Sequence, residues 1–258
     1  MTAVEVHAVE SGAADAAALV LSNSLGTTLD MWGPQLRSLE ERFRVIRYDH
    51  RGHGGSPVPP GPYGIAEVAG DLVALLDRLG VERAHVCGAS MGGQVAMWIA
   101  ANAPDRVDRL VLCCTSPVFG PPELWTERAR IVRAEGTGAV AATVVARWFT
   151  PDYAAAHPDV VERLRAMIAS TPPEGYAGCC EAVRGADLGP DLGAIRAPTL
   201  VIAGAQDPAV PSERTQEIHG GIAGSRLEVL DPGAHLASVE RADRVTELIF
   251  DHLTSEPA

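Results

Sequence analysis

The sequence lacks the long apolar run of a membrane-spanning helix, and it lacks an excess of basic residues. No apolar stretch approaches the roughly 20 residues that such a helix needs. Lysine and arginine together number 21 against 33 acidic residues, so the formal net charge is −12. Nucleic acids and anionic membranes both require a basic protein face. We therefore expect neither as a partner, and any anionic small-molecule substrate would need a locally positive pocket.

Cysteine is scarce, and its spacing excludes both a disulfide framework and a zinc finger. The five cysteines are Cys87, Cys113, Cys114, Cys179 and Cys180, and no two of them form a C-x-x-C motif. Buried thiols in a reducing cytosol are the expected state, and no metal site is indicated. The first ten residues, "MTAVEVHAVE", have neither the basic nor the apolar segment of a signal peptide. We expect a cytoplasmic monomer or small homo-oligomer.

Short apolar runs alternate with helical patterns along most of the 258 residues. Near-continuous apolar strands of this kind are typical of a parallel sheet that is buried on both faces. The runs cover residues 17–23, 43–49, 83–89, 109–115, 198–204 and, as a further candidate, 225–231. The alternation predicts an α/β fold, with a mostly parallel central sheet and helices on both faces.

The helical pattern between two of these strands is unusually long. An earlier segment, residues 64–80, shows one apolar stripe and ends at Gly80, as a single covering helix does. Between residues 118 and 196 the pattern is helical throughout, with no strong strand. We therefore predict a core domain of residues 1–117 and 197–258. Residues 118–196 would form a helical cap over the edge where such sheets bind ligands.

A possible nucleophile follows the strand at residues 83–89. Residues 88–92, "GASMG", match G-x-S-x-G, with a strand before the motif and a helical pattern after it. A serine on so tight a turn adopts an unfavourable backbone conformation, and Gly88 and Gly92 remove side chains that would collide. The turn would present the Ser90 hydroxyl at the carboxyl end of the sheet, above a helix N-terminus.

A nucleophilic serine needs a base and an acid that orients the base. Among eight histidines, His235 follows the last strand in a Pro-Gly loop, whereas His50, His53 and His85 suit shaping or packing roles better. Asp207 directly follows the strand at 198–204, at the same sheet edge. Asp231 competes with it but lies only four residues before the histidine. The chain order Ser90, Asp207, His235 is that of α/β-hydrolases.

An oxyanion hole would complete the site. The backbone N–H of Met91 is one expected donor, and that of Leu25, in the loop after the first apolar strand, is the other. The side chains of Asn23 and Ser24 are expected only to brace that loop. No G-x-G-x-x-G motif opens a first βα turn, so we expect no cofactor.

With these residues in place, nearly the whole chain resembles the α/β-hydrolases and, more narrowly, the 3-oxoadipate enol-lactonases. The shared triad motifs fix only the chemistry. The narrower resemblance rests on "LSNSLGTTLDMW", "DHRGHGGSP", "RWFTP" and "GCCEA". It implies ring opening of 3-oxoadipate enol-lactone to 3-oxoadipate in aromatic catabolism, through an acyl-enzyme at Ser90.

That substrate carries a carboxylate, so the resemblance also implies a cationic contact in the cap. The candidates are Arg128, Arg130, Arg133 and Arg147. We expect Arg133 and Arg147 to contact the substrate, and Trp125 and Trp148 to wall its pocket. The alternatives are a carboxylesterase, a cofactor-free perhydrolase or haloperoxidase, and a C–C bond hydrolase. A hydrolase-fold protein that binds a ligand without turnover is disfavoured, because all three triad candidates are present.

Overall fold

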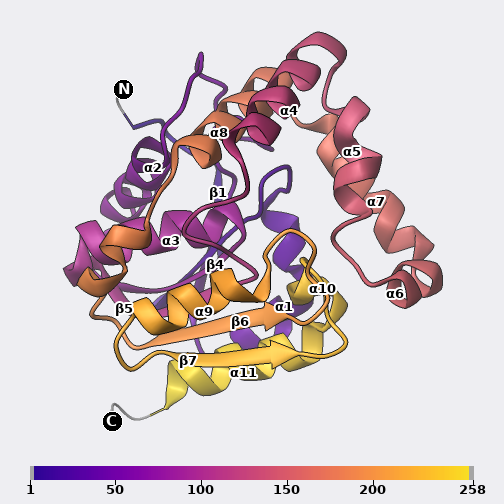
Figure 1. Cartoon of the computed structure of the whole chain (residues 1–258). Helices are drawn as coiled ribbons and strands as arrows, with labels where there is room; N and C mark the ends of the chain where they lie inside the picture. Colours follow the sequence, from indigo (N-terminus) through magenta and orange to yellow (C-terminus); the bar gives the residue numbers. More distant parts are fainter. Residues whose placement is uncertain (1–2, 256–258) are drawn as a thin grey trace.

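Seven strands form one sheet within residues 3–255, the part of the chain that the computed structural model describes (Figure 1). The strands are β1 (Ala8–Ser11), β2 (Ala18–Ser22), β3 (Arg44–Tyr48), β4 (Ala84–Ala89), β5 (Val107–Cys113), β6 (Thr199–Gly204) and β7 (Arg226–Leu230). Their order across the sheet is β1-β3-β2-β4-β5-β6-β7. All six apolar runs of the sequence are strands, as predicted. The short, partly exposed edge strand β1 had no comparable apolar signal.

The register brings the carboxyl ends of the central strands to one edge. Every neighbouring pair is parallel except β1 with β3. Ser22 at the end of β2 pairs with Gly88, Ala89 pairs with Cys113, and Gly204 pairs with Leu230. Loops that leave β2, β4, β6 and β7 therefore begin side by side, which is where open α/β sheets place their ligands.

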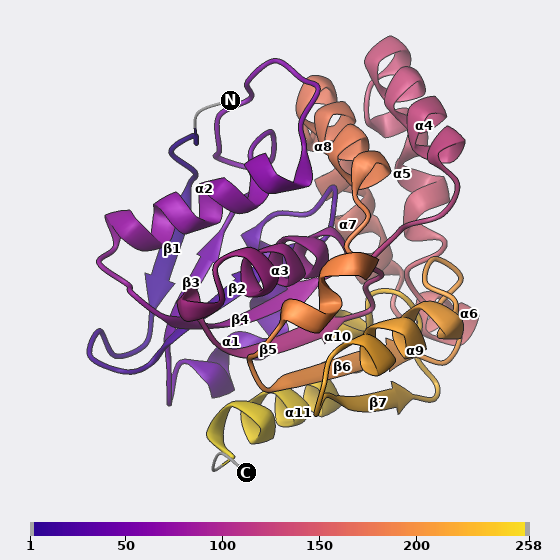
Figure 2. The same cartoon turned by 60° about the vertical axis from the view of Figure 1, so that its left-hand side comes forward.

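Helices cover both faces of this sheet (Figure 2). The core helices are α1 (Gly33–Leu39), α2 (Ile65–Arg78), α3 (Met91–Asn102), α9 (Ser212–Gly221), α10 (Ala237–Glu240) and α11 (Ala242–Thr254). On one face α2 packs against α3, and on the other α1 packs against α11. The predicted stripe of α2 is buried, and the helix ends just before Gly80, whose φ of 65° suits glycine. The mostly parallel, helix-covered sheet is confirmed.

Five further helices lie between β5 and β6 in the sequence and gather above the carboxyl edge (Figure 1). These cap helices are α4 (Pro122–Glu135), α5 (Gly138–Val145), α6 (Pro151–Ala156), α7 (Pro158–Ser170) and α8 (Pro173–Gly185). In the cap, α4 packs against α8, and α5 packs against α7. The division at residues 118 and 196 into two domains stays a prediction.

Two sequence expectations concern bilayers and thiols. Between residues 3 and 255, no helix combines the length and the apolar character needed to cross a bilayer. All five cysteines are free and buried, as expected.

Candidate active site

Ser90 sits on a strained turn between β4 and α3. Its φ of 53° is positive, which is uncommon for a residue with a side chain. A Cβ atom on Gly88 would lie 2.2 Å from the Gly92 carbonyl oxygen, and one on Gly92 would lie 2.3 Å from the Ser22 carbonyl oxygen. The glycines are therefore required for the backbone crossing, as the sequence predicts. The turn holds Ser90 at the carboxyl edge of the sheet.

Three side chains that are distant in sequence form one hydrogen-bonded row at this edge. Ser90 Oγ lies 3.0 Å from His235 Nε2, and His235 Nδ1 lies 2.8 Å from Asp207 Oδ2. An ionised carboxylate only accepts, so Nδ1 carries the imidazole proton and Nε2 accepts the Ser90 hydroxyl. All three residues are buried. The arrangement can remove the serine proton while the carboxylate stabilises the imidazolium that forms.

The loop after β6 fixes the acid of this row. The backbone amides of Ala209 and Val210 donate to Asp207 Oδ1 at 2.7 and 3.0 Å, which leaves Oδ2 for the histidine. The competing Asp231 is exposed at the end of β7. The structure thus pairs His235 with Asp207.

Backbone contacts also anchor the loop that carries His235. Glu240 Oε2 accepts from the Ala234 amide at 2.9 Å, and Oε1 accepts from Thr150 of the cap at 3.2 Å through its amide. The Leu236 amide donates to the Trp148 carbonyl at 2.8 Å. The histidine loop is therefore tied to the cap on both sides of the imidazole. Glu240 was not predictable from the sequence, because a single acid shortly after a histidine forms no recognisable motif.

Two backbone amides next to Ser90 have no acceptor. Neither the Leu25 nor the Met91 N–H makes a hydrogen bond within residues 3–255. Met91 opens α3, where the helix leaves its first N–H groups unpaired. Asn23 braces the Leu25 loop through a 2.6 Å bond from Nδ2 to the Tyr48 carbonyl. Both amides can therefore donate to an oxygen atom that becomes negative beside Ser90.

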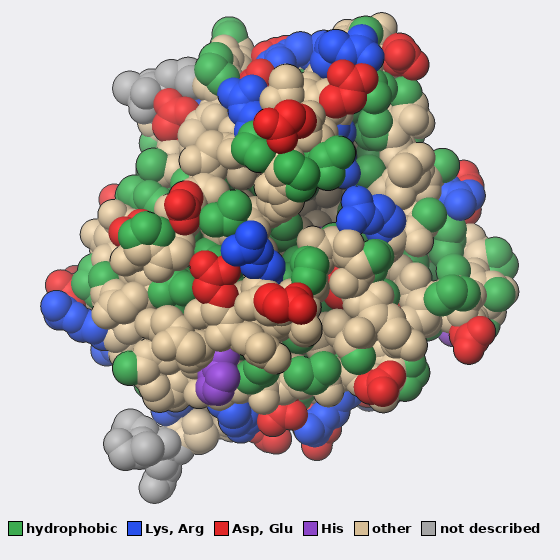
Figure 3. Space-filling model, in the orientation of Figure 1, with side chains coloured by type: hydrophobic (Ala, Val, Ile, Leu, Met, Phe, Trp, Pro, Cys, Tyr) green, Lys and Arg blue, Asp and Glu red, His purple; other side chains and the backbone are tan. Residues whose placement is uncertain are grey.

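A cavity between the cap helices and the sheet edge opens beside Ser90. In Figure 3 this face is hollowed near its centre, and basic and apolar side chains border the hollow. The cavity is lined by Ser24, Leu25, Ser90, Phe119, Gly120, Leu124, Trp125, Arg128, Val144, Arg147, Trp148, Tyr176, Ala209 and His235. Trp125, Trp148 and Arg147 are thus in the wall, where the sequence analysis expected them.

Arg133 is not in this wall, so the expectation that it contacts the substrate is wrong. Its guanidinium makes 2.8 and 2.6 Å ion pairs with Glu174 and Glu181, on the side of α4 that faces α8. Both carboxylates belong to the neighbouring helix α8, so the cation is already paired within the protein.

Arg128, one helical turn after Trp125, takes the place expected for Arg133. Its guanidinium lies 4.6 Å from the centre of the Trp125 ring, and it forms no ion pair with any carboxylate of the described chain. Arg147 also lacks a carboxylate partner there and donates to the Pro208 carbonyl at 2.7 Å. The cavity wall therefore holds two cations that make no ion pair with a carboxylate of residues 3–255.

Tyr176 of α8 is a cavity residue that the sequence did not single out. Its hydroxyl is buried beside the Arg128 guanidinium, and its proton finds no acceptor within the described residues. Burial raises the pKa of Tyr176, so the hydroxyl keeps its proton and remains a donor. An unpaired buried donor is costly, which points to a partner supplied by a ligand.

Comparisons with known proteins agree with this geometry. A family model described as alpha/beta hydrolase fold matches residues 17–242. The chain belongs to the α/β-hydrolase family. Its family and fold confirm the resemblance drawn from the sequence, and the protein is an ester-hydrolysing enzyme.

Three similar proteins indicate where the chain lies within this family. A 3-oxoadipate enol-lactonase of Acinetobacter baylyi is 43% identical over 230 residues, covering 89% of this chain and 86% of the relative. The crystal structure of the enol-lactonase from Burkholderia xenovorans LB400 is 44% identical with a TM-score of 0.95, covering 98% of this chain and 97% of that one. A putative carbamate hydrolase of Stutzerimonas stutzeri is 31% identical, covering 94% of this chain and 93% of the relative. The exact substrate is therefore a matter for proposal.

Proposed function

We propose that the protein opens 3-oxoadipate enol-lactone to 3-oxoadipate in the breakdown of aromatic compounds. The observation that carries this proposal is the shared cavity of the Ser90 row and the unpaired Arg128 cation. In a lactone with a free carboxylate, the lactone carbonyl would meet Ser90 and the carboxylate would meet Arg128. Similarity to the enol-lactonases of Acinetobacter baylyi and Burkholderia xenovorans supports the same substrate.

In the first half of the reaction, Ser90 Oγ attacks the lactone carbonyl while His235 Nε2 takes its proton. The amides of Leu25 and Met91 donate to the carbonyl oxygen as it becomes negative. The ring C–O bond then breaks, and the enol oxygen leaves with the proton from His235. The leaving group stays tethered, because it is part of the same acyl chain.

In the second half, His235 removes a proton from a water molecule, which attacks the acyl-enzyme. The bond to Ser90 Oγ breaks, the serine regains its proton from His235, and the diacid departs. Throughout, Asp207 keeps the imidazole in the tautomer that accepts at Nε2. Every proton in this cycle moves through His235, so no cofactor is required.

The cationic part of the cavity wall suits the carboxylate of this substrate. Arg128 can donate two parallel hydrogen bonds to a carboxylate, and the stacked Trp125 ring holds its guanidinium plane. Tyr176 lines the same cavity, and its hydroxyl, whose proton has no acceptor within the described residues, offers a third donor. Arg147 adds a second positive charge at the wall.

A kinetic panel tests the proposal. We expect kcat/KM for the enol-lactone to exceed that for p-nitrophenyl acetate by about 100-fold or more, because a site with unpaired donors rejects substrates that leave them unpaired. Ethyl carbamate and peroxide-dependent halogenation represent the competing activities and should be slower still. Ser90→Ala should lose nearly all turnover and keep wild-type circular dichroism. Equal rates on the enol-lactone and the simple ester would refute the substrate assignment.

A further inference from the structure

The loop that carries Leu25 contains a tight turn, in which the Thr27 hydroxyl donates to the Ser24 carbonyl at 2.7 Å. The Thr27 amide donates to the Ser24 carbonyl at 3.1 Å, and Gly26, the third residue of this turn, has a φ of 80°. These are features of a type II turn, whose third residue needs the positive φ that glycine supplies. The Leu25 amide adjoins the Leu25–Gly26 peptide, so contacts that fix this peptide also orient that amide.

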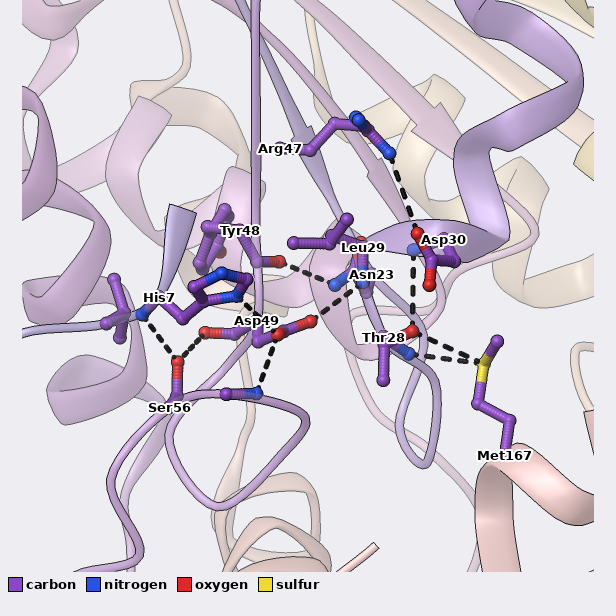
Figure 4. A network of polar contacts seen from close by, with 12 residues as sticks. His7, Asn23, Thr28, Leu29, Asp30, Arg47, Tyr48, Asp49, Ser56 and Met167 are labelled. Atoms are coloured by element: carbon purple, nitrogen blue, oxygen red, sulfur yellow. Dashed lines mark hydrogen bonds and ion pairs between the residues drawn. The ribbon is translucent and has the colours of Figure 1, made fainter. Parts of the chain in front are cut away.

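Such contacts come from the end of β3 and the loop that follows it, residues 48–56. At the start of the Leu25 loop, the Asn23 side chain binds the Tyr48 carbonyl, and at its end the Leu29 amide donates to Asp49 Oδ1 at 2.8 Å (Figure 4). His50 Nε2 lies 3.0 Å from the Asn23 carbonyl oxygen. Both ends of the loop are therefore fixed to one neighbouring segment.

His53 makes the contact at the centre of the turn. The Gly26 amide donates to His53 Nε2 at 2.9 Å, while His53 Nδ1 lies 3.2 Å from the Arg51 carbonyl oxygen. An amide N–H only donates and a carbonyl only accepts, so the ring is protonated at Nδ1 and accepts at Nε2. Burial lowers the pKa of His53 to about 4, which keeps this neutral tautomer at ordinary pH.

We propose that His53 is a positioning residue for hydrolysis: by accepting the Gly26 hydrogen bond, it keeps the adjacent Leu25 amide aimed at the oxyanion. The proposal rests on the proposed function, since it requires an oxyanion formed by attack of Ser90. The alternative is that His53 only fills space between the rings of His50 and Tyr176, whose centres both lie 6.4 Å away.

Two isosteric amides separate these roles. In His53→Gln, the side-chain oxygen reaches about as far as Nε2 and can accept from Gly26. In His53→Asn, the amide reaches only the Nδ1 position, so it can serve the Arg51 carbonyl but leaves Gly26 unpaired. Removal of an oxyanion donor costs about 100- to 1,000-fold in kcat, and a misaimed donor costs part of this.

The expected result is a loss in kcat that the longer amide rescues. His53→Asn should lower kcat for p-nitrophenyl acetate and for the enol-lactone by about 10- to 100-fold, with KM changed less than about threefold. The kcat of His53→Gln should stay within about fivefold of wild type, because the longer amide retains an acceptor for the Gly26 amide. Equal losses in both variants, or a loss in KM alone, would overturn the proposal. Ser90→Ala must be inactive in the same assays. If it is not, the proposed function fails, whatever the His53 variants do.

A trifluoromethyl ketone provides a readout that packing alone would not move. Such ketones add to the active-site serine as a tetrahedral oxyanion, so in His53→Asn their Ki should rise by the factor by which kcat/KM falls. The Ki of the matching methyl ketone, which forms no stable tetrahedral adduct with serine, should change much less. An unchanged Ki of the trifluoromethyl ketone would contradict the positioning role.

A spectroscopic measurement on the wild-type enzyme covers the case in which His53→Asn does not fold. Nitrogen-15 NMR of histidine-labelled protein should show His53 as a neutral ring with the proton on Nδ1 at pH 7. A ring protonated at Nε2, or at both nitrogens, could not accept from Gly26 and would rule the proposal out.

Discussion

At the scale of single residues, Arg128 is the sharpest test of substrate recognition. Arg128→Met keeps the length of the side chain and removes its charge. We expect KM for the enol-lactone to rise by about 10- to 100-fold, with a smaller effect on kcat, since the contact is made in both ground and transition states. Rates on neutral p-nitrophenyl acetate should change little. Steady-state kinetics on both substrates measure the split.

Arg130→Met is the matched control on the same helix. Arg130 is exposed and paired with Glu127 at 2.7 Å, so its removal should leave both parameters unchanged. A variant of Arg128 that loses activity equally on the charged and the neutral substrate would place the carboxylate elsewhere.

Sequence reasoning at this scale succeeds where a residue directly follows a strand. The structure brings Ser90, Asp207 and His235 together because parallel strands end at one edge. The prediction for Arg133 fails because Arg133 and Arg128 lie on different sides of helix α4. At about 100° per residue, Arg128 lies about 60° from Trp125, whereas Arg133 lies about 140° from Arg128. The sequence does not say which of these sides of α4 faces the cavity.

At the scale of elements, Glu240 couples the histidine loop to the cap. Glu240→Ala would leave the amides of Ala234 and Thr150 without their acceptor. We expect the free energy of unfolding to fall by about 1–3 kcal/mol, the usual cost of unpaired buried donors. Turnover should fall as well, because the loop that carries His235 loosens. Urea denaturation and kcat measure the two effects.

Glu247→Ala is the control for this prediction. Glu247 is an exposed acid on α11, paired with Arg244 one helical turn away, and its loss should change stability by less than about 0.5 kcal/mol. The loss of stability in Glu240→Gln, which retains one acceptor oxygen, should lie between the losses in Glu240→Ala and Glu247→Ala. Wild-type stability and turnover in Glu240→Ala would show that the ties are dispensable.

Elements were predictable to the extent that each carries its own pattern. The strands from β2 to β7 and helix α2 show their periodicity, and the glycines at 88 and 92 follow from backbone crowding. β1 was not predicted, because its four partly or fully exposed residues show no alternation of apolar and polar side chains. Contacts such as Glu240 with Thr150, which are 90 residues apart, depend on how the cap packs on the core, and no local signal encodes that packing.

At the scale of the whole molecule, composition bounds the function without choosing it. A net charge of −12 is compatible with an anionic substrate, because Arg128 and Arg147 line the cavity and pair with no carboxylate in the described part of the chain. The overall charge therefore says little about the local field at the site. The fold class follows from the alternation of strands and helices, whereas the substrate depends on side chains that only the tertiary structure gathers.

Buried histidines give the whole molecule a defined response to acid. Burial lowers the pKa of His50 to about 3 and those of His53 and His252 to about 4, against about 6.5 in an unfolded chain. Below pH 6.5 the unfolded state therefore binds protons that the native state does not. Stability should be constant with respect to these groups above that pH and fall as pH drops toward 4.

The slope of this loss tests the argument. Each histidine contributes up to about 1.4 kcal/mol per pH unit, so three can contribute about 4 kcal/mol per unit near pH 5. His252→Gln removes one titrating group and keeps a donor for the Pro198 carbonyl, which lies 3.1 Å from Nε2. Its unfolding free energy, measured by urea denaturation from pH 7 to 4.5, should fall less steeply than that of the wild type by up to about 1.4 kcal/mol per unit. Parallel curves for the two proteins would mean that His252 is protonated as readily in the folded chain as in the unfolded one.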